Sequence, residues 1–199
     1  MSVAIEVWGY ALTWLEIVAF VFTLACVYLN TREHVAAWPI GIVGTGLYAV
    51  LFFESKLYGD FGLQFVYIAS SVYGWYAWSR GGANDERLAV SRVPKKTALF
   101  AGGFVIFAWP LAGLFFDRCT DTDVPYFDAL PTVLSLCGQW MLARKHIENW
   151  WLWIVADVIY VVLFIYKHLY LTSLLYALFI GLCALGLRDW NRSLRKSQG

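Results

Sequence analysis

The sequence contains few charged residues. Only 15% of its 199 residues are Asp, Glu, Lys or Arg, whereas a soluble domain has about 25%, and 60% are apolar. This composition excludes a disordered chain and disfavours a soluble globular enzyme. The formal net charge is +1, which excludes the usual basic type of nucleic-acid-binding protein, so we expect no nucleic acid among the partners.

The sequence also lacks the motifs of common membrane pumps and proteases. It has no Gly-rich phosphate loop ending in Lys, no G-x-S-x-G nucleophile motif and no H-E-x-x-H zinc motif. Its four Cys residues do not form the pattern of a disulfide framework, and its three His residues lie in predicted loops, where we expect solvated side chains. We therefore predict that the protein is not an enzyme and has no cofactor and no metal site.

Seven long apolar runs account for most of the chain. One crossing of a bilayer takes about 20 apolar residues, so seven crossings leave room for short polar loops and no separate soluble domain. The runs lie at 10–30, 37–53, 61–79, 98–116, 126–142, 150–166 and 171–187. The sequence therefore predicts an all-α integral membrane protein with seven transmembrane helices.

The positions of Lys and Arg predict the orientation of the chain. Loops on the cytoplasmic side of a membrane carry an excess of these residues. Twelve of the 15 fall on the C-terminal side of the predicted spans, and the other three are Lys56, Arg118 and Lys167. We expect the C-terminus in the cytoplasm and the N-terminus outside.

The sequence repeats itself at an offset of 112 residues. The matched pairs include His34 with His146, Trp38 with Trp150, Tyr48 with Tyr160, Gly74 with Gly186 and Trp78 with Trp190. Because four crossings restore the direction of the chain, this offset predicts a 3+1+3 arrangement of two parallel three-helix repeats, an architecture of transporters. We divide the chain into a first repeat (1–80), a cytoplasmic loop with a linking fourth helix (81–121), and a second repeat with a cytoplasmic tail (122–199). A duplicated bundle without a transport role is the alternative.

Polar and aromatic side chains share one face of the predicted sixth span. Trp150, Trp153, Asp157 and Tyr160 follow helical spacing. Asp157 is the only ionisable residue well inside a span, which makes it a functional candidate by default. The alternatives are a structural Asp bonded to a neighbouring hydroxyl, and Trp residues that anchor the helix at the membrane interface.

Three other spans carry matching faces. The second presents Trp38 with small residues, the third presents Gln64 and Tyr67, and the fifth presents Gln139 behind Asp128, for which we favour helix capping. Such polar stripes also hold helices together. Aromatic walls with a few amide and carboxyl groups suit a flat, polar, partly cationic heterocycle. We predict a substrate site formed by Trp38, Gln64, Tyr67, Gln139, Trp150, Trp153, Asp157 and Tyr160.

These residues carry a resemblance to a known family. The segments Trp38–Ile42, Leu57–Asp60 and Tyr73–Trp78 resemble the first repeat of the PnuC family of vitamin transporters, and Ala143–Trp150 with Trp153, Asp157 and Leu169–Thr172 resembles the second. The family's Trp-x-x-Trp-x-x-x-Asp pattern matches Trp150, Trp153 and Asp157, and its third-span Gln matches Gln64. The resemblance implies a fold similar to that of full-length SWEET transporters and a place in the bacterial cytoplasmic (inner) membrane.

The resemblance also implies a function. Members import nicotinamide riboside by facilitated diffusion, and a cytoplasmic kinase traps the substrate by phosphorylation. Relatives take thiamine, riboflavin or deoxynucleosides. The alternatives are therefore a transporter of another vitamin, with thiamine as the first candidate, and a small-solute channel. One buried acid is thin support for a proton path, so we predict uniport. We further expect a homo-oligomer.

Overall fold

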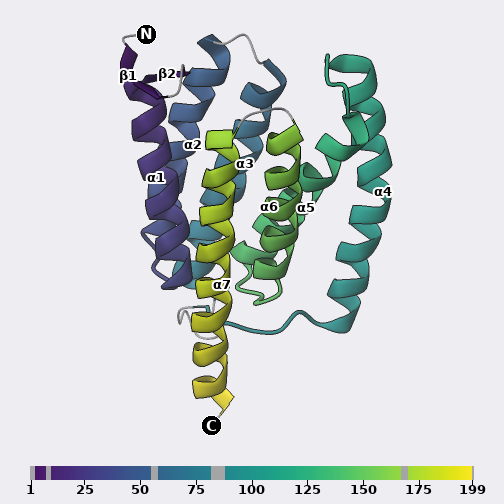
Figure 1. Ribbon diagram of the computed structural model, residues 1–199. Helices are drawn as coiled ribbons and strands as arrows, with labels where there is room; N and C mark the ends of the chain where they lie inside the picture. The colour runs from purple at the N-terminus through teal and green to yellow at the C-terminus, as the bar shows by residue number, and fades with distance from the viewer. Residues whose placement is uncertain (1–2, 8–9, 55–57, 82–87, 167–169, 199) are drawn as a thin grey trace. The chain divides into compact units, whose positions relative to one another are not determined.

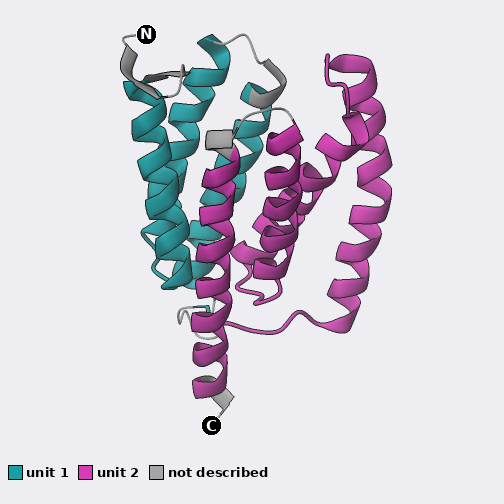
Figure 2. Ribbon diagram, in the orientation of Figure 1, with its two compact units in different colours: residues 1–88 teal, residues 89–199 magenta. Residues whose placement is uncertain are grey.

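A computed structural model describes residues 3–7, 10–54, 58–81, 88–166 and 170–198. Within these residues the chain forms seven α-helices, preceded by a two-stranded antiparallel hairpin (Figure 1). It divides into two compact units, residues 1–88 and 89–199 (Figure 2). The division into 1–80, 81–121 and 122–199 stays a prediction. Lys56, Lys167 and His168 lie outside the described residues.

The first unit contains the hairpin and three helices. Strands β1 (Val3–Val7) and β2 (Tyr10–Thr13) precede α1 (Trp14–Thr31), α2 (Ala37–Glu54) and α3 (Tyr58–Arg80). Helix α2 packs against both α1 and α3. The predicted first span is wrong at its start, because residues 10–13 are a strand. A capping box starts the helix at Trp14: the Thr13 hydroxyl accepts from the Glu16 N–H at 3.2 Å, and Glu16 Oε2 accepts from the Thr13 N–H at 2.7 Å.

The second unit contains four helices that pack in chain order. They are α4 (Lys95–Cys119), α5 (Pro125–Ala143), α6 (Asn149–Tyr166) and α7 (Tyr170–Gln198). A buried cluster of Ala101, Cys137 and Met141 joins α4 to α5. The outer side of α4 carries bare apolar side chains such as Leu99, 79% exposed, and Phe107, 74% exposed, as expected for a surface that faces lipid.

Five of the seven helices are long and apolar enough to cross a membrane by their length and composition. Helices α3 and α5 fall outside this group, and they are two of the helices on which the sequence predicts polar faces. The six earlier spans agree with the helices to within three residues at most of their ends, whereas α7 continues eleven residues beyond the predicted 187. The fold is therefore the predicted seven-helix membrane architecture with a longer last helix.

The repeat is visible in the turns between the first two helices of each three-helix set. Glu33 and Lys145, which are 112 positions apart, both have left-handed backbones, with φ of 54° and 52°. In both turns the N–H of the following His donates to a carbonyl five residues earlier at 3.0 Å, from His34 to Leu29 and from His146 to Met141. Each three-helix set thus turns from its first helix to its second by the same hydrogen bonds.

Candidate functional site

Asp157 lies in the interior of the second unit, in the middle of α6. Its side chain is only 4% exposed, and its Oδ2 accepts a hydrogen bond from the Cys183 thiol of α7 at an S–O distance of 3.7 Å. Among the described residues this thiol is its hydrogen-bond partner. Because a thiol is a weak donor and a carboxylate has about four acceptor positions, most of the hydrogen-bonding capacity of Asp157 is left for another donor.

Trp153 lies one turn before Asp157 and is half-buried against α5. The contact depends on Gly138, because a Cβ added there would approach the Trp153 Nε1 to 3.2 Å. The equivalent contact in the first unit is made by Cys26 and Gly41, with the larger side chain on the other helix. Gly41 stands at the position of Trp153, and Cys26 stands at the position of Gly138. A Cβ added at Gly41 would lie 2.9 Å from Cys26 Sγ. The two units therefore keep the same helix contact but only the second presents an indole there.

Trp150 has a packing role in the second unit. It is 2% exposed, it meets the buried Trp190 edge to face with ring centroids 5.3 Å apart, and it lies over Gly186, where an added Cβ would approach its ring to 2.5 Å. This arrangement fixes the start of α6 on α7.

Trp38 repeats this arrangement in the first unit. It is 2% exposed, its ring centroid lies 5.2 Å from that of Trp78, and it covers Gly74. The indole Nε1 atoms of Trp38 and Trp150 are buried, and neither has a hydrogen-bond partner among the described residues. Packing accounts for both rings, and their place in a substrate site stays a prediction.

Tyr160 belongs to an aromatic cluster at the far end of α6. Its ring stacks on Phe164 with centroids 5.8 Å apart and meets Tyr176 of α7 at 4.9 Å. Tyr48 and Phe52 form the equivalent stacked pair in the first unit, with centroids 5.9 Å apart. Tyr160 is half-buried, so one side of α6 presents aromatic surface on both sides of Asp157.

The remaining predicted site residues lie on three-helix sets of both units. Gln64 and Tyr67 are half-buried on α3 of the first unit, and Gln139 is half-buried on α5 of the second. Each unit is described by itself, so a single site that includes residues of both stays a prediction. The sequence favours helix capping for Asp128, but the N-cap residue of α5 is Val124, without a side-chain cap. Asp128 accepts a hydrogen bond from the Thr122 hydroxyl and so holds the chain that enters α5.

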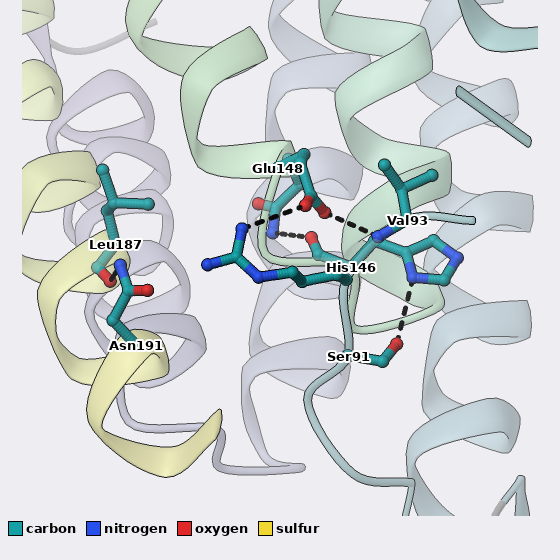
Figure 3. Close-up of polar contacts among 8 residues, drawn as sticks. Ser91, Val93, His146, Glu148, Leu187 and Asn191 are labelled. Atoms are coloured by element: carbon teal, nitrogen blue, oxygen red, sulfur yellow. Dashed lines mark hydrogen bonds and ion pairs between the residues drawn. The ribbon is translucent and has the colours of Figure 1, made fainter. Parts of the chain in front are cut away.

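The turn between α5 and α6 holds the segment that leads into α4 (Figure 3). Ser91 forms two backbone hydrogen bonds with this turn, both 3.0 Å long, and its hydroxyl lies 3.1 Å from His146 Nδ1. The Val93 N–H donates to Glu148 Oε2 at 2.9 Å. Partial burial lowers the pKa of His146 below its ordinary value, with Arg144 adding to this effect and Glu148 opposing it. The expectation of a solvated side chain is wrong for His146, because it is half-buried and bonded to Ser91.

Sequence reasoning missed Gly138 and Cys183. Both signals are present in the repeat. The offset of 112 pairs Gly138 with Cys26 and Trp153 with Gly41, so the exchange of small and large residues is readable from the sequence. The same offset pairs Cys183 with Ser71, which is on the polar face of the third span. No group of three or more His, Cys, Asp or Glu that could hold a metal ion occurs within the described residues.

Comparison with known proteins gives consistent matches over nearly the whole chain. A family model described as nicotinamide mononucleotide transporter matches residues 13–192. The nicotinamide riboside transporter PnuC of Escherichia coli (strain K12) is 29% identical, over 94% of this chain and 89% of that protein. The riboflavin/roseoflavin transporter RibM of Streptomyces davaonensis is 27% identical, over 99% and 94% respectively.

A solved structure shares the fold. The crystal structure of the vitamin B3 transporter PnuC matches with a TM-score of 0.73, and the match covers 92% of this chain and 83% of that one. The two sequences are 20% identical, so this likeness concerns the fold alone. It confirms the seven-helix architecture expected from the apolar runs and the repeat.

Proposed function

The chain belongs to the nicotinamide mononucleotide transporter family, a family of multi-pass membrane transporters, and from this premise we propose that it imports nicotinamide riboside. The observation that carries the proposal is the face of α6. A half-buried indole, held against Gly138, lies one turn from a buried carboxylate whose partner is a weak donor. A pyridinium ring is flat and cationic, so it gains from stacking on Trp153 and from the charge of Asp157.

The proposed site extends beyond these two residues. Gln139 on the neighbouring α5 and Tyr160 on α6 supply an amide and an aromatic ring in the second unit. Gln64 and Tyr67 carry the same two groups on α3 of the first unit, and their membership of the site stays a prediction. We propose that the amides orient the carboxamide and ribose of the substrate, because a small number of placed polar groups fixes a ligand within an aromatic pocket. The buried rings of Trp38 and Trp150 fix the starts of α2 and α6, and their contact with the substrate stays a prediction.

A binding titration tests the proposal. Nicotinamide riboside, thiamine, riboflavin and a deoxynucleoside are added in turn to the purified protein, and the fluorescence of its 11 Trp residues is followed. Saturable quenching by nicotinamide riboside alone supports the assignment. Trp153→Ala and Asp157→Asn should each weaken this binding, while Trp151→Ala should not, because Trp151 is 57% exposed on another side of α6. Equal binding by all three variants would contradict the proposed site.

A change in the charge of the ligand separates the role of Asp157 from that of Trp153. Dihydronicotinamide riboside has the same size but lacks the positive charge and the aromaticity of the ring. The wild-type protein should prefer the oxidised form, and Asp157→Asn should reduce that preference. If both proteins discriminate equally between the two forms, Asp157 does not face the ring.

A different vitamin is the second candidate. The similarity to the riboflavin/roseoflavin transporter RibM favours riboflavin, and thiamine carries a cationic ring that meets the same requirements. Quenching by one of these ligands and not by nicotinamide riboside would reassign the substrate and leave the site in place. A channel would instead show uptake that does not saturate and no acceleration by substrate on the opposite side.

We further propose uniport in the bacterial cytoplasmic membrane, with the N-terminus outside and the C-terminus in the cytoplasm. The asymmetry of Lys and Arg supports this orientation. Uptake into proteoliposomes should equilibrate, should resist a protonophore, and should become accumulation when a nucleoside kinase and ATP are enclosed. Collapse of uptake by the protonophore would contradict uniport. Light scattering in detergent tests the expected homo-oligomer.

A further inference from the structure

The last helix extends well past its apolar part. Residues 171–187 contain no charged side chain, and α7 then continues to Gln198 with the basic residues Arg188, Arg192, Arg195 and Lys196. Cations in the last turn of a helix are favoured by its dipole, which accounts for the last two. It does not account for Arg188, which lies nearly three turns before the helix end.

This extension is anchored on the second unit. Trp190 is fully buried against Trp150, and Leu194, one turn later, is 7% exposed. These two residues define the inner face of the extension. The opposite face is therefore fixed in orientation, so that it presents the same side chains outward.

The outward face carries a groove. Arg188, Asn191, Arg192 and Arg195 follow the spacing i, i+3, i+4 and i+7 and line a shallow, open space of about 320 Å³ between their side chains, which we call the arginine groove. Asn191 is held in place because its amide donates to the Leu187 carbonyl at 2.8 Å (Figure 3).

Charge in the arginine groove is organised by one acid. Asp189 Oδ1 lies 3.1 Å from the Arg188 Nε and 3.7 Å from an Arg192 terminal nitrogen, and its side chain is 16% exposed. It positions two guanidinium groups but neutralises only one charge. Arg195 has no ion pair among the described residues. The groove thus keeps a net positive charge and unused donors, in the fork geometry that matches phosphate.

We propose that the arginine groove binds the phosphate of an anionic phospholipid headgroup. The position on the helix favours a lipid as the source of that phosphate. The groove begins directly after the apolar stretch and runs from Arg188 to Arg195, which is about 10 Å along a helix. Each headgroup layer of a bilayer is about 5–8 Å deep. Basic clusters immediately beyond a membrane helix bind anionic lipids by this charge complementarity. The site goes beyond the transport function and does not depend on which substrate is carried.

A lipid titration tests the site. The purified protein in neutral detergent is mixed with phosphatidylglycerol or phosphatidylcholine, and bound lipid is counted by native mass spectrometry while the unfolding midpoint is followed. The wild-type protein should bind phosphatidylglycerol at least about tenfold more tightly than phosphatidylcholine, and its midpoint should rise with the former. The triple variant Arg188→Gln, Arg192→Gln, Arg195→Gln should lose that difference.

A matched variant separates a built site from general attraction. Arg80→Gln, Lys95→Gln and Lys96→Gln remove the same charge from exposed positions on other helices, and Arg80 is the repeat partner of Arg192. This control should keep the preference for phosphatidylglycerol. Equal loss in both triple variants, or no loss in the first, would overturn the proposal. Equal protection by inorganic phosphate, with nothing added by phosphatidylglycerol, would assign the arginine groove to soluble phosphates and overturn its assignment to lipid.

Discussion

The contact between Gly186 and Trp150 gives the sharpest test of how the second unit is held together. A Cβ added at Gly186 would lie 2.5 Å from two carbons of the Trp150 ring, far inside van der Waals contact. The ring has little freedom to move away, because Trp190, one turn along the same helix, already packs against it with ring centroids 5.3 Å apart. Gly186→Ala must therefore push α6 from α7 or force the indole from its rotamer.

The magnitude follows from two opposing terms. Ala in place of Gly inside a helix stabilises by about 0.5–1 kcal/mol, because the unfolded chain loses freedom. Overpacking of a well-packed contact costs about 1–3 kcal/mol. Gly181 lies on the same helix, and nothing within 4 Å would meet a Cβ there, so Gly181→Ala carries the first term alone. We expect the free energies of unfolding of the two variants to differ by about 1–3 kcal/mol, with Gly186→Ala the less stable.

The measurement is reversible unfolding in mixed micelles, followed by Trp fluorescence. Trp150→Ala should remove most of the penalty of Gly186→Ala in a double-mutant cycle, since the two residues share one contact. The repeat predicts the same result in the first unit, where Gly74→Ala meets Trp38 and Gly62→Ala meets nothing within 4 Å. If Gly186→Ala were as stable as Gly181→Ala, the packing role of Trp150 would be refuted.

Three further predictions concern the second unit. Gly138→Ala should weaken nicotinamide riboside binding severalfold in the fluorescence titration, because the added Cβ displaces Trp153, and unchanged affinity would contradict that contact. Because burial lowers the pKa of His146 below its ordinary 6.5, the folded state binds fewer protons than the unfolded state. Stability should therefore fall as the pH drops through about 6.5. In His146→Gln the unfolding midpoint should depend less on pH between about 7.5 and 5.5 than in the wild-type protein. The same pH dependence in both proteins would show that His146 does not contribute. Cys119 is exposed at the end of α4, so a membrane-impermeant maleimide should label it in intact cells and not label Cys119→Ser; labelling only after lysis would reverse the proposed orientation.

The architecture was predictable because its signals are local. Each apolar run is long enough to predict a helix, and the offset of 112 relates the two three-helix sets from the sequence alone. The hairpin before α1 was missed because residues 10–13 run on into the apolar stretch of the helix without a polar break, and the Thr13–Glu16 capping box marks the boundary. The extension of α7 was missed because Trp190 and Leu194 alone are buried among those of its residues whose side chains the structure describes, and their neighbours are polar.

The candidate site was only partly predictable. Helical spacing places Trp150, Trp153 and Asp157 on one face, but spacing does not say which neighbour covers each part of that face. The partner that buries Trp150 comes from 40 residues later in the chain, and the glycine that accommodates Trp153 comes from 15 residues earlier. Such long-range pairings decide whether an aromatic side chain lines a site or packs between helices, and they appear only once the helices are packed.

The helix contact at positions 26 and 41 of the first unit, and at 138 and 153 of the second, limits which substitutions each half accepts. The Cys26–Gly41 and Gly138–Trp153 pairs fill the same place with the bulk on opposite partners. A side chain added at position 138 would crowd the indole of Trp153, and a side chain added at position 41 would meet Cys26. Building the same aromatic wall in the first half would therefore take two changes, Cys26→Gly and Gly41→Trp. A single substitution leaves either a crowded contact or an unfilled one, so packing at this place favours the asymmetry between the two halves.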